Sequence, residues 1–382
     1  MELVFQCRDS GLRAMLVLGL GSERENAERE VLEAGLPLGL SHRAAWAENL
    51  YHHEPWFLLV RDENGRARAG VAIEQIRPRS LPGQVILRVE KFGGNLPPEV
   101  SRLVLQAIAH LTKTNPSILW SVVNVFSRDR RDTIGEVLKE IGFREVQAPS
   151  TYRYTLVIDL RPSEDAIFAS FSTNARRRIR ETTKMCLRSM VITDPIYAEK
   201  LKELQQQAFE RTGGHNSSLD WRQVLKMSQE FPQLSRVAGL FLDEDTSPEK
   251  MEAFLWVCNH GDHVEYRAAG STRRSDVRIP YGYQLAWEMI PWAKAVGAEW
   301  FDMGGVTLAE GDRPELDGIS RFKRYFSRNV VEVGAEWVLE PSPVRARIAA
   351  LVSSSASHVN RLMEELRTRS KVRIAAFTNL MS

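Results

Sequence analysis

A run of cations in FSTNARRRIRETTK, residues 171–184, is the first feature of the sequence that could do chemistry. A serine or threonine at its start can cap a helix, and on that helix Arg176 and Arg180 share one face. The nearby acid, Glu181, is better placed to pair with Arg177. A cationic stripe at a helix start can bind a phosphate or another polyanion. Composition alone favours the simpler interpretation, a solvated helix face.

A second candidate combines a glycine-ended strand, WFDMGG at 300–305, with the helix GISRFKRYF at 318–326. The pair Gly304–Gly305 lets a ligand approach the backbone closely. Lys323, beside Phe322, can bind a phosphate or stack near a base. A surface lysine on an ordinary amphipathic helix is the competing interpretation.

Histidine and cysteine supply less chemistry. His260 and His263 have a metal-like spacing, but they fall in a hairpin turn without an evident third ligand, so we expect no metal. His215 could be a base, although a loop histidine that faces solvent is the more common case. The sequence has no GxSxG motif, and Cys186 and Cys258 lie in apolar runs that predict burial. A covalent acyl-enzyme is therefore disfavoured.

The bulk composition sets the limits for these sites. The chain has 382 residues, of which 43% are hydrophobic and 26% charged, and its net charge is +2. This length suits two cores better than one, and the small net charge excludes a general polyanion binder. Three separated cysteines favour a reducing compartment, and no apolar run is long enough to span a membrane. We expect a cytoplasmic protein.

The elements that must position these residues repeat along the chain. A strand–turn–strand pattern at 56–76 recurs at 237–257, about 180 residues later. The helices and strands that follow each hairpin keep the same offset. We therefore predict an α/β protein with mixed sheets, made of two tandem units with helices on both faces of each sheet. The predicted boundaries are 1–150, 151–340 and a basic helical tail at 341–382.

Taken in order, the motifs between residues 150 and 335 resemble the FemAB family of peptidoglycan aminoacyltransferases and its relatives in exopolysaccharide gene clusters. The shared series is an F-S-x-x-x-R-R-x-I-R helix, a helix that ends at an Arg-Gly break, a strand pair with Y-R, a long helix, a D-x-G-G strand and an F-K-x-x-F helix. The first half of the chain matches in architecture only. The resemblance implies two tandem GNAT-like acyltransferase units with the acceptor in a groove between them.

The resemblance also implies site residues. The residues at positions with catalytic roles are Lys323, Tyr281 and Asp302. The residues at substrate-binding positions are Arg176, Arg177, Arg180, Arg211, Phe322, Gly304 and Gly305.

Some features depart from the family pattern. Ser327 replaces the glycine after F-K-x-x-F, and no charged heptad pair for a coiled-coil arm is evident. The segment RIPYGYQL at 278–285 lacks the glycine-rich loop with which CoA-dependent GNAT enzymes bind pyrophosphate. Both aminoacyl-tRNA and acyl-CoA therefore remain open as donor substrates, and no bound cofactor is expected.

Three functions follow as hypotheses. The first is N-acyl or aminoacyl transfer onto a nucleotide-linked or lipid-linked cell-envelope sugar. The second is acyl-CoA-dependent acetyl transfer in exopolysaccharide biosynthesis, and the third is binding of a sugar nucleotide without catalysis. The partners implied are the sugar-nucleotide or lipid-linked precursor, tRNA, and peripheral contact with the inner face of the membrane.

Overall fold

The computed structural model describes residues 1–7, 10–50, 55–78, 80–94, 96–185, 187–212, 219–242, 244–272, 279–308 and 314–342. Three features considered in the sequence lie outside these ranges: His215, Cys186 and the predicted tail beyond Ser342. Within the described part of the chain, no helix combines the length and the apolar character that crossing a membrane requires.

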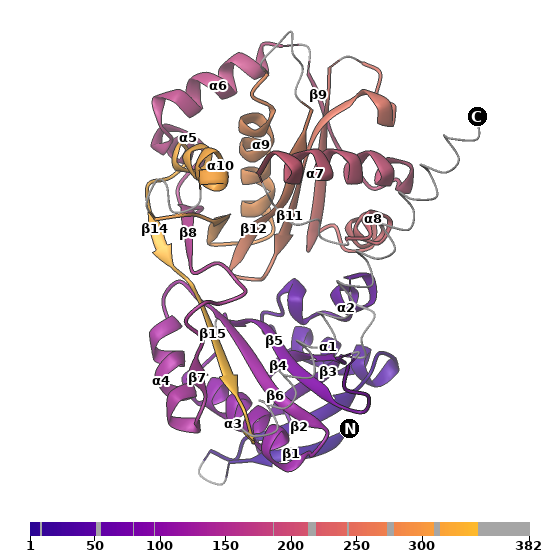
Figure 1. Ribbon diagram of the computed structural model, residues 1–382, viewed down its shortest axis with the longest axis vertical. Helices are drawn as coiled ribbons and strands as arrows, with labels where there is room; N and C mark the ends of the chain where they lie inside the picture. Colours follow the sequence, from indigo (N-terminus) through magenta and orange to yellow (C-terminus); the bar gives the residue numbers. More distant parts are fainter. Residues whose placement is uncertain are drawn as a thin grey trace, which may run out of the picture.

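The first unit is a mixed sheet with helices on both faces (Figure 1). Its strands are β1 (Glu2–Gln6), β2 (Arg13–Leu18), β3 (Trp56–Arg61), β4 (Ala67–Ile76), β5 (Val85–Gly93), β6 (Ile118–Phe126) and β7 (Arg144–Glu145). Helices α3 (Pro98–Thr114) and α4 (Arg131–Ile141) bury apolar side chains against one face, and α1 (Ser22–Glu33) against the other. The short elements η1 (Leu40–His42) and α2 (Ala44–Leu50) lie toward the second unit.

The second unit has the same layered build. Its strands are β8 (Tyr154–Asp159), β9 (Arg188–Val191), β10 (Ser235–Phe241), β11 (Met251–Asn259), β12 (His263–Ser271), β13 (Trp300–Gly305) and β14 (Val330–Glu332). One face carries α5 (Glu164–Ser170), α6 (Thr173–Thr183), α9 (Tyr281–Ala295) and α10 (Pro314–Arg324). The other carries η2 (Pro195–Tyr197), α7 (Ala198–Thr212) and α8 (Trp221–Glu230), and η3 (Pro248–Lys250) precedes β11.

The two sheets correspond strand by strand apart from the additional edge strand β1 of the first, which confirms the predicted tandem α/β architecture. The first sheet has the order β1-β2-β3-β4-β5-β6-β15-β7, and the second β9-β10-β11-β12-β13-β8-β14. Elements β3 to β7 recur as β10 to β14 at the predicted offset of about 180 residues, with α3 and α4 recurring as α9 and α10. The last strand, β15 (Gly334–Leu339), corresponds to β8.

These two equivalent strands are exchanged between the units. Strand β8 follows the first unit in sequence but pairs with β13 and β14, whereas β15 follows the second unit and pairs with β6 and β7. Figure 1 shows β15 running from the upper unit into the lower sheet. The predicted unit 151–340 therefore does not close on itself, because its final strand belongs to the first sheet. Strand pairing between residues distant in the chain carries no local sequence signal that would have placed it there.

The exchange requires two chain segments to cross closely. At the crossing, the amides of Val333 and Gly334 both donate to the carbonyl of Arg153, at 2.9 and 3.1 Å. A Cβ placed on Gly334 would lie 2.1 Å from the carbonyl oxygen of Tyr152. Since this neighbour is backbone, it cannot rotate away, and the position requires glycine.

We predict that Gly334→Ala lowers the urea midpoint of unfolding, because the new methyl group forces the crossing segments apart. Overpacking of this kind costs about 1–3 kcal/mol. The matched control is Gly318→Ala, on the exposed side of α10, where a Cβ would meet nothing within 4 Å. There alanine should keep or raise the midpoint, since glycine is the weaker helix former. Equal midpoints for the two variants would contradict the close crossing.

Candidate active site

An opening between β12 and β13 lies in the second sheet. These parallel strands pair only from His263 to Glu265 on β12 and from Trp300 to Asp302 on β13, although β12 continues to Ser271. Beyond that point the strands diverge. The equivalent strands of the first unit, β5 and β6, pair from Val85 with Ile118 to Gly93 with Phe126, with an interruption at Glu90 and Lys91 after which they pair again. The opening is therefore a property of the second unit.

Lys323 of α10 reaches into this opening. Its Nζ donates to the carbonyl of Gly305 on β13 at 2.8 Å. A Cβ on Gly304 would lie 3.2 Å from the same Nζ and 3.3 Å from the Tyr266 carbonyl of β12, so the amine sits between the two strands. Lys323 is only 8% exposed. Burial lowers the pKa of Lys323 to about 8, against the opposing effect of Asp302 and Glu265.

Asp302, fully buried on β13, is held by three donors. Its Oδ1 accepts from the Gly304 amide at 2.8 Å and from the Thr155 hydroxyl. Its Oδ2 accepts from the Tyr152 hydroxyl at 2.5 Å. Gly304 has a φ of 75°, in the left-handed region, and this turn brings its amide back to the carboxylate. The Asp-x-Gly-Gly motif thus fixes a buried negative charge beside the opening.

Glu265 lies beside Asp302 in the strand register and is also buried. Its carboxylate contacts Lys91 Nζ of the first unit at 3.4 Å, His260 Nε2 at 3.0 Å and Arg267 at 3.6 Å. Burial alone would raise the pKa of Glu265, but Lys91 and Arg267 hold it well below its usual value. Glu265 is therefore an anion paired across the junction of the two units.

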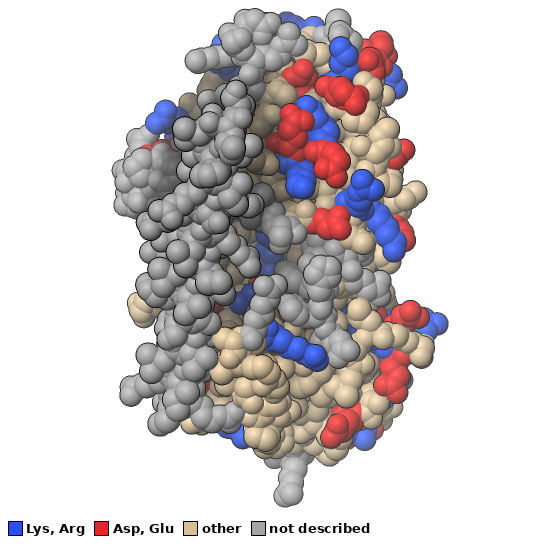
Figure 2. All heavy atoms as spheres, turned by 45° about the vertical axis from the view of Figure 1, so that its right-hand side comes forward, with Lys and Arg blue, Asp and Glu red and all other residues tan. Residues whose placement is uncertain are grey.

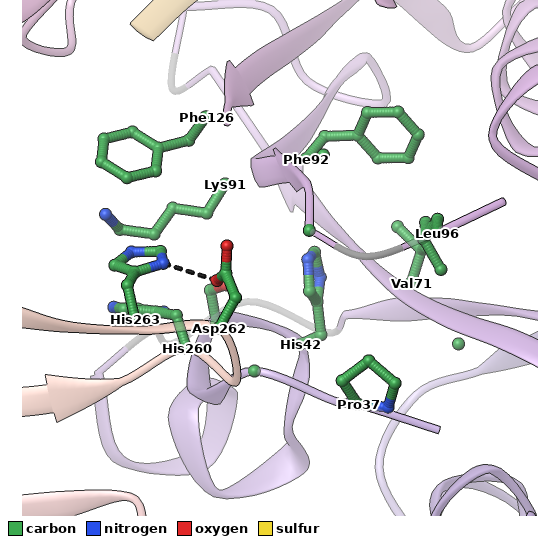
Figure 3. Close-up of a pocket in the computed structure, with 15 residues that line it drawn as sticks. Pro37, His42, Val71, Lys91, Phe92, Leu96, Phe126, His260, Asp262 and His263 are labelled. Carbon is green, nitrogen blue, oxygen red and sulfur yellow. Dashed lines mark hydrogen bonds and ion pairs between the residues drawn. The ribbon is translucent and has the colours of Figure 1, made fainter. Parts of the chain in front are cut away.

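Lys91 enters this junction from an unusual backbone conformation, with φ at 46°. Its ammonium lies 3.6 Å from the centre of the Phe126 ring. Figure 3 shows Lys91 between Phe126 and His263, whose Nδ1 bonds Asp262 at 2.7 Å. Contacts from both units therefore fix the lysine.

A cleft of about 330 Å³ lies between the units beside this network. It is named here the inter-unit cleft. Its polar and aromatic lining comprises Ser41, Trp46, Arg88, Glu90, Lys91, Asn124 and Phe126 of the first unit, Tyr152 of the connection, and His260, Glu265 and Arg267 of the second.

Several buried polar atoms on the cleft walls have no hydrogen-bond partner in the described part of the chain. They are Ser41 Oγ, Arg88 Nε, Lys91 Nζ, Asn124 Oδ1 and His260 Nδ1. A buried polar atom without a partner costs free energy, and unpaired groups that gather on one cleft indicate a site for a polar ligand or ordered water.

Two charged side chains of β5, Arg88 and Glu90, line the first-unit wall of the cleft, and Glu74 lies beside this wall. Glu74 of β4 lies opposite Arg88 of β5, and the Glu90 carboxylate accepts from the Asn124 amide at 3.0 Å. Burial, together with the nearby charge of Glu90, raises the pKa of Glu74 to about 8. Glu74 is therefore mostly protonated at neutral pH.

The structure brings together four of the residues predicted from the sequence: Lys323, Asp302, Gly304 and Gly305. Phe322 packs against the start of α9, where a Cβ on Gly282 would lie 3.3 Å from its ring. Tyr281 is buried at that helix start, and its hydroxyl lies 3.3 Å from Glu252 on β11. The catalytic role of Tyr281 stays a prediction.

The basic helix lies elsewhere. Because the stripe of Arg176 and Arg180 lacks local acids, the sequence predicts that it faces the groove between the units. Helix α6 instead lies at the far end of the second unit from the first (Figure 1), and neither arginine lines the inter-unit cleft. Arg176 turns back to the Ala169 carbonyl at 2.5 Å, and Arg180 lies 5.3 Å from the Phe168 ring. These local contacts account for the difference.

Two further arginines are also on the surface. Arg177 pairs with Glu181, as the spacing predicts. Arg211 is exposed in the last turn of α7. On the face in Figure 2 the acidic and basic side chains of the described residues are interspersed, in keeping with the small net charge. Phosphate binding by these arginines stays a prediction.

The sequence analysis missed the residues that join the units. Arg88 and Glu90 alternate with apolar residues in VILRVEKFG, a pattern that could have indicated a strand face with charged side chains. Tyr152 gave no such signal, since its partner Asp302 is 150 positions away. Among the described residues, no group of three or more His, Cys, Asp or Glu could hold a metal ion.

No protein-family model matches the sequence, and a search of curated proteins gives no match. Solved structures do match. FemX aligns with a TM-score of 0.68 at 12% identity, over 88% of this chain and 100% of FemX. The C-terminal domain of a putative lysylphosphatidylglycerol synthetase from Agrobacterium fabrum aligns with a TM-score of 0.50 at 12% identity, over 87% of this chain and 96% of that domain. At this identity the matches show a shared fold, which confirms the predicted FemAB-like architecture.

The buried amine gives a prediction for stability against pH. Lys323 has a pKa of about 8 when folded and 10.5 when unfolded, so between these values the unfolded state binds more protons and stability rises with pH. Compared with Lys323→Met, the wild type should therefore gain on the order of 2 kcal/mol between pH 7.5 and 10.5. Urea unfolding of both proteins across this range measures the difference. A difference that does not change with pH would show that the amine is not desolvated.

Proposed function

We propose that the protein is an acyltransferase that moves an acyl or aminoacyl group onto an amine or hydroxyl of a cell-envelope precursor. The observation that carries this proposal is the buried Lys323 amine in the opening between β12 and β13, in a chain with the fold of FemX. The family resemblance of the D-x-G-G and F-K-x-x-F motifs, which build this opening, supports the same assignment.

The transfer itself needs no covalent enzyme intermediate. The acceptor nitrogen or oxygen attacks the donor carbonyl, a C–N or C–O bond forms, and the ester or thioester bond breaks. The acceptor loses a proton, and the leaving hydroxyl or thiol gains one. Since the donor is already activated, the protein contributes mainly positioning and the stabilisation of the charge that develops on the carbonyl oxygen. Lys323 is the group we assign to that charge or to a donor phosphate.

The inter-unit cleft is the proposed acceptor site. Its buried atoms without a hydrogen-bond partner in the described part of the chain include two donors that make only ion-pair contacts, Lys91 Nζ and Arg88 Nε, and an acceptor, Asn124 Oδ1. A nucleotide-linked or lipid-linked sugar offers phosphate, hydroxyl and amide groups that match such a set. The Tyr152 hydroxyl donates to Asp302 and lies 3.3 Å from Glu265, so this side chain connects the cleft with the opening that holds Lys323.

The donor is aminoacyl-tRNA or acyl-CoA, and an assay should offer both with nucleotide-linked and lipid-linked acceptors. The cytoplasmic location remains a prediction from the sequence. Sugar-nucleotide binding without turnover by either donor would favour the non-catalytic alternative.

We predict that Lys323→Met lowers transfer by about tenfold to a thousandfold with whichever donor is used, as expected for loss of one charged contact to the transition state. The methionine keeps most of the apolar stem and so preserves packing. Steady-state kinetics measure the effect. The control is Lys226→Met, an exposed lysine that lies 3.9 Å from Glu230 on α8, which should keep full activity. Full turnover by the Lys323→Met variant would show that the active site is not in this opening.

A second prediction concerns the cleft. Arg88→Met should raise the KM for the acceptor about tenfold and leave the KM for the donor unchanged, because one polar contact of about 1.4 kcal/mol is lost on the acceptor side only. Arg102→Met is the matched control, since Arg102 pairs with Glu140 on the outer surface of α3 and α4. If donor and acceptor KM values rise together, the cleft is not a separate acceptor site.

A further inference from the structure

Tyr152 occupies the point where the two units are joined. It lies two residues before the start of β8, beside the crossing with Gly334. Its ring meets Phe126 of the first unit edge-on, with centroids 5.6 Å apart. On the other side, a Cβ on Gly305 of the second unit would come within 2.7 Å of the Tyr152 Cβ. The ring is therefore clamped between the units.

The hydroxyl of Tyr152 lies between two buried carboxylates. It donates to Asp302 Oδ2 at 2.5 Å and lies 3.3 Å from Glu265 Oε1. Burial raises the pKa of Tyr152 well above its ordinary value, and the charges of Asp302 and Glu265 add to this effect, so the hydroxyl keeps its proton. The single hydroxyl hydrogen is donated to Asp302, which is at the shorter distance. The carboxylate of Glu265 is neutralised instead by the cations around it.

These two carboxylates are also the charges that act on Lys323. Among the described residues, Lys323 forms no ion pair of 4.0 Å or less with either of them, and its amine bonds the Gly305 carbonyl instead. Asp302 has its oxygens occupied by Tyr152, Thr155 and the Gly304 amide. Asp302 therefore lies near Lys323 without forming an ion pair with its ammonium.

We propose that Tyr152 is a positioning residue for Lys323: by occupying Asp302 Oδ2, it keeps the lysine amine on the Gly305 carbonyl in the opening between β12 and β13. The consequence for transfer rests on the proposed function, but the coupling between the two side chains does not. Because Tyr152 also lines the inter-unit cleft, the same hydroxyl connects the cleft with the lysine.

Removal of the Tyr152 hydroxyl should raise the protonated fraction of Lys323. In Tyr152→Phe, Asp302 Oδ2 loses its donor, and the freed carboxylate attracts the ammonium form of Lys323. We expect the pKa of Lys323 to rise by about one unit. The measurement is an NMR titration of protein labelled with 13Cε-lysine, in which the Lys323 signal is identified by its absence in Lys323→Met. No substrate is needed.

Tyr197→Phe is the matched control. Tyr197 is a buried tyrosine whose hydroxyl donates to the Thr246 carbonyl at 2.6 Å, so its loss removes a comparable hydrogen bond away from Asp302. Its stability cost should be similar, and the Lys323 titration should not move. A folded Tyr152→Phe protein in which Lys323 titrates as in the wild type would overturn the proposal.

A second variant covers the case in which Tyr152→Phe does not fold. 3-Fluorotyrosine at position 152 keeps the ring and donates a stronger hydrogen bond, so the pKa of Lys323 should fall. An unchanged titration there overturns the proposal as well. If the titration shifts as expected but Lys323→Met keeps full transfer activity, the positioning stands and the proposed catalytic role of Lys323 fails.

Discussion

The structure depends on two negative charges, Glu265 and Asp302, that lie side by side on β12 and β13 with almost no exposure to solvent. A buried carboxylate is tolerated only when donors or cations surround it, and two adjacent carboxylates also repel each other. The donors come from both units. Lys91 belongs to the first unit and Tyr152 to the connection, whereas the Gly304 amide and Arg267 belong to the second. The contacts that neutralise these two carboxylates therefore also hold the two units in one relative position.

The two halves differ beside these charges although their topology is shared. In the first unit β5 and β6 pair again at Phe92 and Gly93 after an interruption at Glu90 and Lys91, whereas in the second β12 and β13 part just after the Glu265–Asp302 pair. Lys323 can enter because the opening is there, and it is buried against carboxylates that partly offset the cost of desolvating an ammonium. The repeated topology thus provides the same scaffold in both units, and the divergence of one strand pair provides the opening in the second.

The sequence predicted the repeated elements because hydrophobic periodicity and turn residues are local signals. The hairpin with Asn64-Gly65 became β3 and β4, and the predicted strand WFDMGG and lysine helix became β13 and α10. The sequence did not predict that NVVEVGAEWVL divides between two sheets as β14 and β15, since the choice of partner strand depends on distant residues.

For the candidate site, the motif resemblance indicated Lys323 and Asp302. Tyr152, Lys91 and Glu265 could not be identified from the sequence, because their contacts are with residues distant in the chain. Arg176 was predicted to face the groove between the units, because composition does not reveal which way a helix faces.

The exchange of β8 and β15 has a consequence for synthesis on the ribosome. The first sheet has an open position between β6 and β7 until residues 334–339 have left the exit tunnel, although domains usually fold as they emerge. During that interval the edges of β6 and β7 expose unpaired backbone groups that another chain could occupy. The first sheet therefore stays incomplete until β15 has been synthesised, and a separately expressed segment 1–150 would lack one strand of its own sheet.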